Sequence, residues 1–297
     1  MITSAVLRFS RLVLAVTLCV SAPSHALDYT QLRAVKQLTA DKRYDEAIQR
    51  LQALAAKADE AGENFHYLEL AIAIAVKSLN DADRALALAA GIKDVAYRDF
   101  ARLNVLADLG RFDEALASVQ GKNVDTWPVR CRGQAHGILA EIYHSEKDDT
   151  AELEQWQLAA NTSGAEVGVR GRALREAGVI HLKRGEAAKA EEQFRKALGV
   201  TPSGYAWRTE SLIALSSLLV QTQRAKEAVQ AFGGIDFTKI ANITSRGHLL
   251  EAYARALLAA GKKIKAVETF DQLLQLNLPA EWKARINKEL DQMAEEF

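Results

Sequence analysis

The side chains in this sequence that are best suited to catalysis or metal binding are its histidines, but their spacing does not form a reactive site. His136 and His144 are eight residues apart and fall on roughly one helical face, but no carboxylate or cysteine completes a metal-ligand spacing with them. Gly233-Gly234 is not followed by the Lys-Ser or Lys-Thr pair of a phosphate-binding loop, and no Gly-x-Ser-x-Gly elbow occurs. The sequence therefore predicts no enzyme activity, no metal site and no cofactor.

Paired acids are plentiful, and they have a simpler explanation than catalysis. Asp45-Glu46 and Asp113-Glu114 lie where second helices are expected to begin, and a helix N-terminus favours acids. Glu191-Glu192 and Glu295-Glu296 read as solvated helix faces. A hydrolytic pair among these acids is the alternative, but no spacing singles one out.

These side chains sit on a pattern that repeats seven times around a small residue. Successive centres are separated by 38, 30, 37, 38, 38 and 38 residues, and a fixed period of this size is typical of stacked helical hairpins. Glu152 replaces alanine in the fourth copy, where the register can be shifted by one residue either way. The centres are Ala47, Ala85, Ala115, Glu152, Ala190, Ala228 and Ala266.

Around each centre the residue types predict two helices and a turn. A glycine stands five residues earlier in three copies (Gly110, Gly185 and Gly261), where a first helix must end and the chain reverse. Apolar residues recur four and seven positions after the centre, with Lys122 as the exception, and nine before it, with His181 as the exception. Twelve before it the residues are mostly small. Each hairpin thus has an apolar seam that only a stacked neighbour can bury.

In these positions the chain resembles the tetratricopeptide-repeat family. The residues that carry the resemblance are Gly110 to Ala115, Gly185 to Ala197 followed by Pro202, and Asp41 to Ala47. The spacing of 38 exceeds the family's 34 by about one helical turn, which longer helices would explain. We therefore expect an all-α, right-handed superhelical α-solenoid of about seven antiparallel helix pairs, spanning residues 27–297.

Two irregularities carry their own predictions. The step of 30 residues between Ala85 and Ala115 is too short for two full helices, so the second pair should be shortened or distorted near residues 81–95. After Pro279, apolar residues spaced four, four and three apart predict one amphipathic helix that caps the last hydrophobic face.

Residues 1–26 have the order of a secretory signal peptide. Arg8 and Arg11 precede a short apolar run, and Ser24-His25-Ala26 is a small-residue cleavage pattern. The run is too short to span a membrane. We expect export with cleavage after Ala26, most simply to a periplasm; a lipoprotein attached through Cys19 or an organelle transit peptide are the alternatives.

The expected mature chain is nearly neutral and keeps a single thiol. Without Arg8 and Arg11 it has 36 basic and 38 acidic residues. This balance does not predict the clustered basic surface that binds nucleic acid, nor a polybasic patch that binds membranes. Cys131 is its only cysteine, so no intrachain disulfide can form. We interpret Cys131 as a buried helix-face thiol, with an intermolecular disulfide or a reactive thiol as the alternatives. His181 stands where other copies have Leu, Val or Tyr, and we interpret it as a residue of the apolar seam.

The resemblance implies that a partner binds the first helix of each pair, which lines the concave face. Arginine binds carboxylates through two parallel hydrogen bonds. In the fifth copy, a local basic cluster for a carboxylate or an acidic peptide would consist of Arg172, Arg175 and Lys183. Gln134, Glu141, His144 and Ser217 share this face. The residues we expect to bind the partner are Arg172, Arg175, Lys183, Glu210, Gln221, His248, Glu251 and Arg255.

Three functions fit this sequence. The favoured one is a non-enzymatic exported adaptor that holds another envelope protein or peptide segment. The second is a helical module that shapes the cleft of an enzyme acting on envelope polymers, although repeats occupy the chain to its end. The third is a homo-oligomeric structural subunit that stacks through its N-terminal hairpin.

Overall fold

The computed structural model describes residues 28–201 and 206–295, and within them it contains fifteen α-helices and no strand. The expected signal peptide and Pro202 lie outside the described residues. Fourteen helices form seven antiparallel pairs and the fifteenth stands alone, so the all-α solenoid with a terminal helix is confirmed. The pairs are α1 (Tyr29–Ala40) with α2 (Tyr44–Lys57), α3 (Ala61–Ile74) with α4 (Ala82–Ala90), α5 (Val95–Asp108) with α6 (Phe112–Val119), α7 (Val129–Glu146) with α8 (Asp149–Asn161), α9 (Val167–Lys183) with α10 (Ala187–Gly199), α11 (Ala206–Gln221) with α12 (Ala225–Ala231), and α13 (Ile243–Ala259) with α14 (Lys263–Leu274), followed by α15 (Ala280–Glu295).

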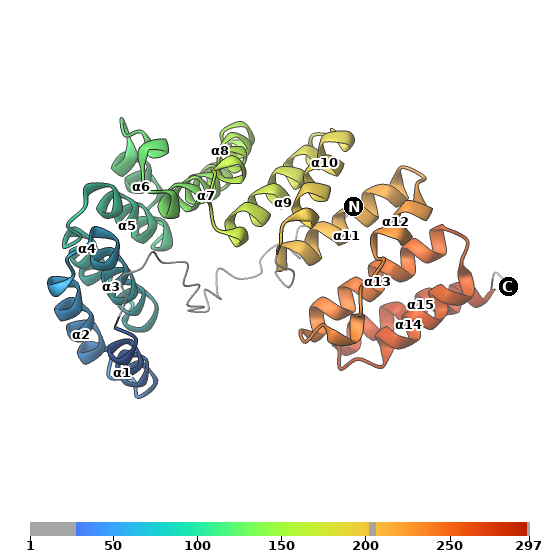
Figure 1. Ribbon diagram of the computed structural model, residues 1–297. Helices are drawn as coiled ribbons and strands as arrows, with labels where there is room; N and C mark the ends of the chain where they lie inside the picture. Colours follow the sequence, from blue (N-terminus) through green and yellow to red (C-terminus); the bar gives the residue numbers. More distant parts are fainter. Residues whose placement is uncertain (1–27, 202–205, 296–297) are drawn as a thin grey trace.

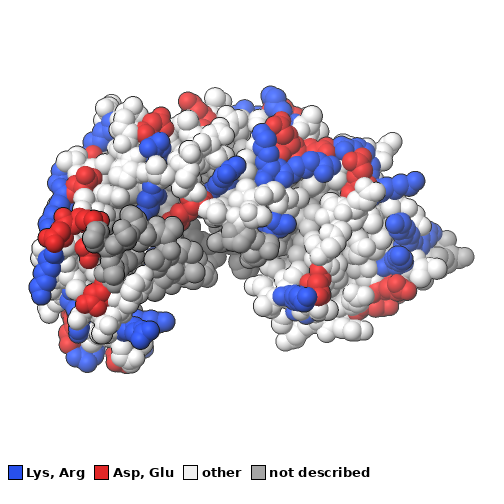
Figure 2. Space-filling model, viewed as in Figure 1, with Lys and Arg blue, Asp and Glu red and all other residues white. Residues whose placement is uncertain are grey.

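The pairs follow one another along an arch (Figure 1). The first helices α5, α7 and α9 lie on its inner side, and the second helices α6, α8 and α10 on its outer side. Lys, Arg, Asp and Glu are intermingled on the face that Figure 2 shows, so that face carries no large patch of one sign.

The turn within each pair has the same backbone conformation in all seven copies. Five residues before each centre the chain has a positive φ, which Gly110, Gly185 and Gly261 adopt at +71°, +74° and +75°. The other four copies force non-glycine residues into the same region: Lys42, Asn80, Lys147 and Gln223. Lys147 therefore settles the register of the fourth copy on Glu152.

The residue at the centre of each copy is buried between the two helices of its pair. All six alanine centres are fully buried. Glu152 is also buried, and it accepts hydrogen bonds from Trp156 Nε1 (3.3 Å) and, on its other oxygen, pairs with His144 Nδ1 (3.0 Å). Polar partners thus allow a carboxylate where six copies have a methyl group.

The second pair is distorted as its spacing predicts. Its first helix ends in a five-residue π-helical turn, η1 (Ala75–Leu79), and α4 is only nine residues long. Two later second helices are shorter still: α6 has eight residues and α12 has seven. Each is followed by a 3₁₀ turn, η2 (Val124–Thr126) after α6 and η3 (Phe237–Lys239) after α12.

The expected terminal cap is α15. Ile286 is fully buried against the last pair, with Trp282 and Leu290 packed beside it. None of the helices in the described ranges is long and apolar enough to cross a membrane.

Candidate interaction surface

A chain of ion pairs links the first helices of the fourth, fifth and sixth copies. Arg172 on α9 pairs with Glu141 on α7 at 2.5 Å, and Arg175 on α9 pairs with Glu210 on α11 at 3.0 Å. Glu176 lies between the two arginines, 3.9 Å from Arg172 and 2.8 Å from Arg175. The structure therefore brings together three of the predicted surface residues, Arg172, Arg175 and Glu210.

The two arginines of this chain differ in their access to solvent. The Arg172 side chain keeps 47% of its surface exposed, and its guanidinium lies 5.3 Å from the centre of the Trp156 ring. Arg175 is only 13% exposed. Burial raises the pKa of Glu176, and the positive charges of Arg175 and Arg172 oppose that rise. Arg172 is thus the cation of this group that an incoming carboxylate can reach.

Lys183 and Gln221 lie apart from this chain. Lys183 is exposed in the last turn of α9. Gln221 is exposed at the end of α11, where its amide donates to Ser217 Oγ at 3.5 Å. The ion pairs that join Arg172 and Arg175 to Glu141, Glu176 and Glu210 do not extend to either residue.

The last three predicted residues, His248, Glu251 and Arg255, contact the terminal helix. Glu251 is buried and receives hydrogen bonds from Trp282 Nε1 (2.7 Å) and from the Arg285 guanidinium (2.7 and 3.0 Å). Arg255 pairs with Glu251 and with Glu289, and the His248 ring lies 4.4 Å from that of Trp282. Burial lowers the pKa of His248. These residues hold α15 in place.

Sequence reasoning missed a second polar cluster, on the first helices of the N-terminal half. Arg130 at the start of α7 reaches past α5 to α3, where it contacts Glu69 (2.8 Å) and His66 Nδ1 (3.3 Å). Its guanidinium lies 5.5 Å from the centre of the Phe65 ring, which stacks on Tyr97. Burial, assisted by the charge of Arg130, lowers the pKa of His66 to about 4. Only the curvature of the arch brings residues more than 60 positions apart into contact here.

Next to Arg130, Cys131 is fully buried. Burial raises the pKa of its thiol, so the reactive thiolate is disfavoured. The interpretation of Cys131 as a buried helix-face thiol is confirmed.

The remaining histidines have structural partners. His181 is buried, and its Nδ1 lies 2.6 Å from Glu186, whose pKa the hydrogen bond lowers. His136 is buried between Gln155 (2.8 Å) and Asp125 (3.2 Å). No group of three or more His, Cys, Asp or Glu in the described part of the chain has the arrangement of a metal site.

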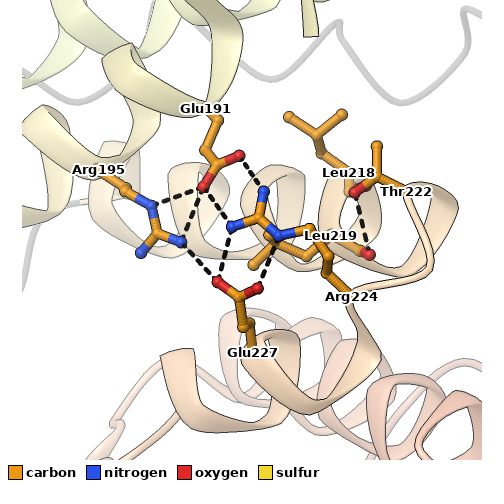
Figure 3. A network of polar contacts seen from close by, with 7 residues as sticks. All are labelled: Glu191, Arg195, Leu218, Leu219, Thr222, Arg224 and Glu227. Carbon is orange, nitrogen blue, oxygen red and sulfur yellow. Dashed lines mark hydrogen bonds and ion pairs between the residues drawn. The ribbon is translucent and has the colours of Figure 1, made fainter. Parts of the chain in front are cut away.

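Charged residues on the outer side join the fifth and sixth pairs (Figure 3). Arg224, which precedes α12, lies between Glu191 of α10 (2.6 Å) and Glu227 (2.6 Å), and Arg195 contacts Glu191 at 2.9 Å. The pairing of Arg224 with Glu227 recurs at the same offsets in two other copies, as Arg43–Glu46 and Arg111–Glu114. This network is solvent-accessible and mutually neutralised, so it stabilises the stacking modestly.

Comparison with known proteins supports the fold. The chain matches no model of a protein family, and no curated protein is significantly similar to it in sequence. Among solved structures, it is similar to pilF of Pseudomonas aeruginosa, with a TM-score of 0.50 and 18% identity over 78% of this chain and 98% of that one. It is also similar to a multidomain signal-transduction ATPase of Pyrococcus horikoshii that has a tetratricopeptide-repeat sensor. That match has a TM-score of 0.55 and 13% identity over 88% of this chain and 43% of the other.

The geometry and these matches define a tetratricopeptide-like helical repeat fold. At such low identities the likeness concerns the fold alone. What this chain binds must be argued from its own surface.

Proposed function

We propose that this protein is a non-enzymatic exported scaffold that binds another envelope protein through the inner side of its arch. The first helices of seven stacked pairs supply a long inner surface with varied side chains. Extended surfaces of this kind are what stacked repeats use for binding.

The observation that carries this proposal is the placement of Arg172. Its guanidinium is held from one side by Glu141 and stacked near Trp156, yet half of the side chain is open to solvent. A guanidinium fixed in this way loses little side-chain entropy when it binds, and its planar fork fits a carboxylate. We infer that the partner presents an acidic side chain or a carboxy-terminus to this position.

The test is charge reversal at Arg172 with a matched control. Arg172→Glu should weaken partner binding at least tenfold, because the new negative charge repels the partner's carboxylate that Arg172 attracts. Arg195→Glu on the outer side changes the same charge at nearly the same exposure, 48% against 47%, and should leave binding unchanged. Binding is measured with the partner captured by photo-crosslinkers placed on α9 and α11. Equal effects of the two substitutions would remove the inner site.

Export is tested separately from binding. The proposed signal peptide predicts that the protein in a periplasmic fraction has the intact mass of residues 27–297. A mass that includes residues 1–26, or recovery only with cytoplasmic proteins, would contradict export without bearing on Arg172.

The self-stacking alternative receives little support from the N-terminal pair. Its hollow between α1 and α2 has a volume of about 670 Å³ and is lined mainly by polar side chains. These include Gln37, Asp41, Arg43, Glu46, Gln49 and Arg50. Such a surface offers little apolar area for the end-to-end contact of two copies.

A further inference from the structure

The solenoid has a gap in its stacking between the third and fourth pairs. Every other second helix packs along the first helix of the next pair, but α6 barely touches α7. The chain leaves α6 at Val119 and turns at Gly121, which has a φ of +74°. Lys122, the exception in the apolar pattern, therefore lies outside the helix, and its ammonium pairs with Asp99 at 2.8 Å.

The gap forms a groove of about 630 Å³ between α6, the turn that follows it, and the outer sides of α7 and α8. Its apolar wall consists of Leu116, Ala117, Val119, Val124 and Leu139, and Tyr143 stands beside them. His136 lines it as well, with only 5% of its side chain exposed.

In the sixth pair, the space equivalent to this groove is filled by side chains. There too the second helix is short and is followed by a glycine with positive φ, Gly234, and a 3₁₀ turn. Three aromatic rings fill the space: the Phe232 and Tyr253 centroids lie 5.1 Å apart, and those of Phe237 and Tyr253 lie 5.6 Å apart.

The third pair has smaller residues at the corresponding positions. Val119 and Phe232 both stand four residues after their centres, and Leu139 and Tyr253 both stand thirteen before theirs. Val124 and Phe237 both begin the 3₁₀ turn. The groove is therefore the space that three aromatic rings occupy elsewhere in this chain.

The rim of the groove favours a cation. Asp113 is exposed, and the Asp125 side chain is 62% exposed although it pairs with His136. Lys122 is the ammonium on this rim, and Asp99 already neutralises it. The net charge that a ligand meets at the rim is negative.

We propose that this outer groove is a second docking site, for a segment of a partner polypeptide that inserts an aromatic side chain beside a lysine or arginine. The ring takes the space that Phe237 and Tyr253 fill in the sixth pair, and the neighbouring cation pairs with Asp113 and Asp125. The site is separate from the inner side of the arch, so the result of its test does not depend on whether Arg172 binds a partner.

The test uses a capped tripeptide, acetyl-Lys-Phe-Lys-amide, added to the full mature chain with methyl-labelled leucine and valine. We expect saturable NMR shifts at Leu139 and Val124. The peptides acetyl-Lys-Ala-Lys-amide and acetyl-Glu-Phe-Glu-amide should each bind at least tenfold more weakly, a difference of about 1.4 kcal/mol. Equal binding of all three peptides, or no shift at these methyls, would overturn the proposal.

Two variants separate binding in the groove from binding elsewhere. Val124→Phe with Leu139→Tyr installs two of the three rings of the sixth pair and should abolish binding of the aromatic peptide while the protein stays folded. Asp113→Lys alters only an exposed side chain and should shift the preference toward acetyl-Glu-Phe-Glu-amide, which keeps the test decisive if the filled variant does not fold. Undiminished binding in the filled variant, or an unchanged preference in Asp113→Lys, would contradict the site.

Discussion

Replacing Gly171 with alanine is expected to destabilise the protein by about 1–3 kcal/mol, the usual cost of overpacking a buried contact. Gly171 lies on α9 where the Trp207 ring of α11 rests directly on the backbone. An added Cβ would lie 2.6 Å from Trp207 Cδ2 and closer still to two other ring atoms. The ring is buried, so it cannot move away without disturbing its neighbours.

Helix propensity alone predicts the opposite effect of Gly171→Ala on the free energy of unfolding. Alanine is favoured over glycine within a helix by about 1 kcal/mol, so a helix without a packing constraint would gain stability. Gly199→Ala is the control for packing, because Gly199 is exposed at the last residue of α10 and an added Cβ there meets nothing within 4 Å. Denaturant unfolding of both variants measures the difference. A Gly171→Ala variant as stable as Gly199→Ala would show that the two pairs do not pack as described.

Loss of the Glu251 charge is expected to release the terminal helix. In Glu251→Gln the bonds to Arg285 and Arg255 lose their ionic character, at a cost of about 2 kcal/mol for hydrogen bonds to a charged group. Because each repeat contacts only its neighbours, the loss should be confined to α15 and the last pair. Amide hydrogen exchange should therefore accelerate in α15 and not in the first four pairs.

The same carboxylate predicts an acid-sensitive cap. Burial by itself would raise the pKa of Glu251, but the hydrogen bond from Arg285 and the charges of Arg255 and Arg285 outweigh it and lower the pKa. A lowered pKa in the folded state means that this stabilisation is complete above the pKa of the unfolded chain. It is lost as pH falls through the folded value. The protection of α15 amides, measured relative to their intrinsic exchange rates at the same pH, should thus fall on acidification below about pH 4, the ordinary range of a glutamate.

An exposed glutamate provides the control for both experiments. Glu268→Gln on α14 removes a charge of the same sign from the surface of the last pair. It should leave the protection of α15 unchanged at neutral pH and retain the loss of protection in acid. Cap exchange in Glu251→Gln that still responds to acid as in the parent protein would assign the pH dependence to another group.

Much of the fold follows from local pattern, and the reason lies in the turn and the centre of each copy. A helix pair needs a reversal five residues before a small residue, and both features are set by neighbours in the sequence. Even the copies without glycine obey the pattern, since Asn80 and Gln223 take the left-handed conformation that Gly185 takes at its position. The distorted second pair and α15 were predictable for the same reason.

The binding surface was less predictable, because the sequence places charges on faces without showing what they meet. Arg172 and Arg175 are equivalent in the sequence, but one is exposed and the other is enclosed by Glu176 and Glu210. Likewise, Glu251 lies on a predicted partner-binding face until α15 is seen to cover it.

The amino-acid sequence by itself determined that this protein is a stack of helical pairs, because helix periodicity and turn conformation depend on residues close in the chain. Only the tertiary structure decided which of its surfaces remain open. Ion pairs such as Arg285–Glu251 join residues 34 positions apart. The outer groove, in turn, exists because α6 fails to pack on α7, and because Val119, Val124 and Leu139 are smaller than the three aromatic residues at the same positions of the sixth pair. Contacts between repeats depend on how each pair is rotated against the next, and that rotation is set by packing across the whole interface.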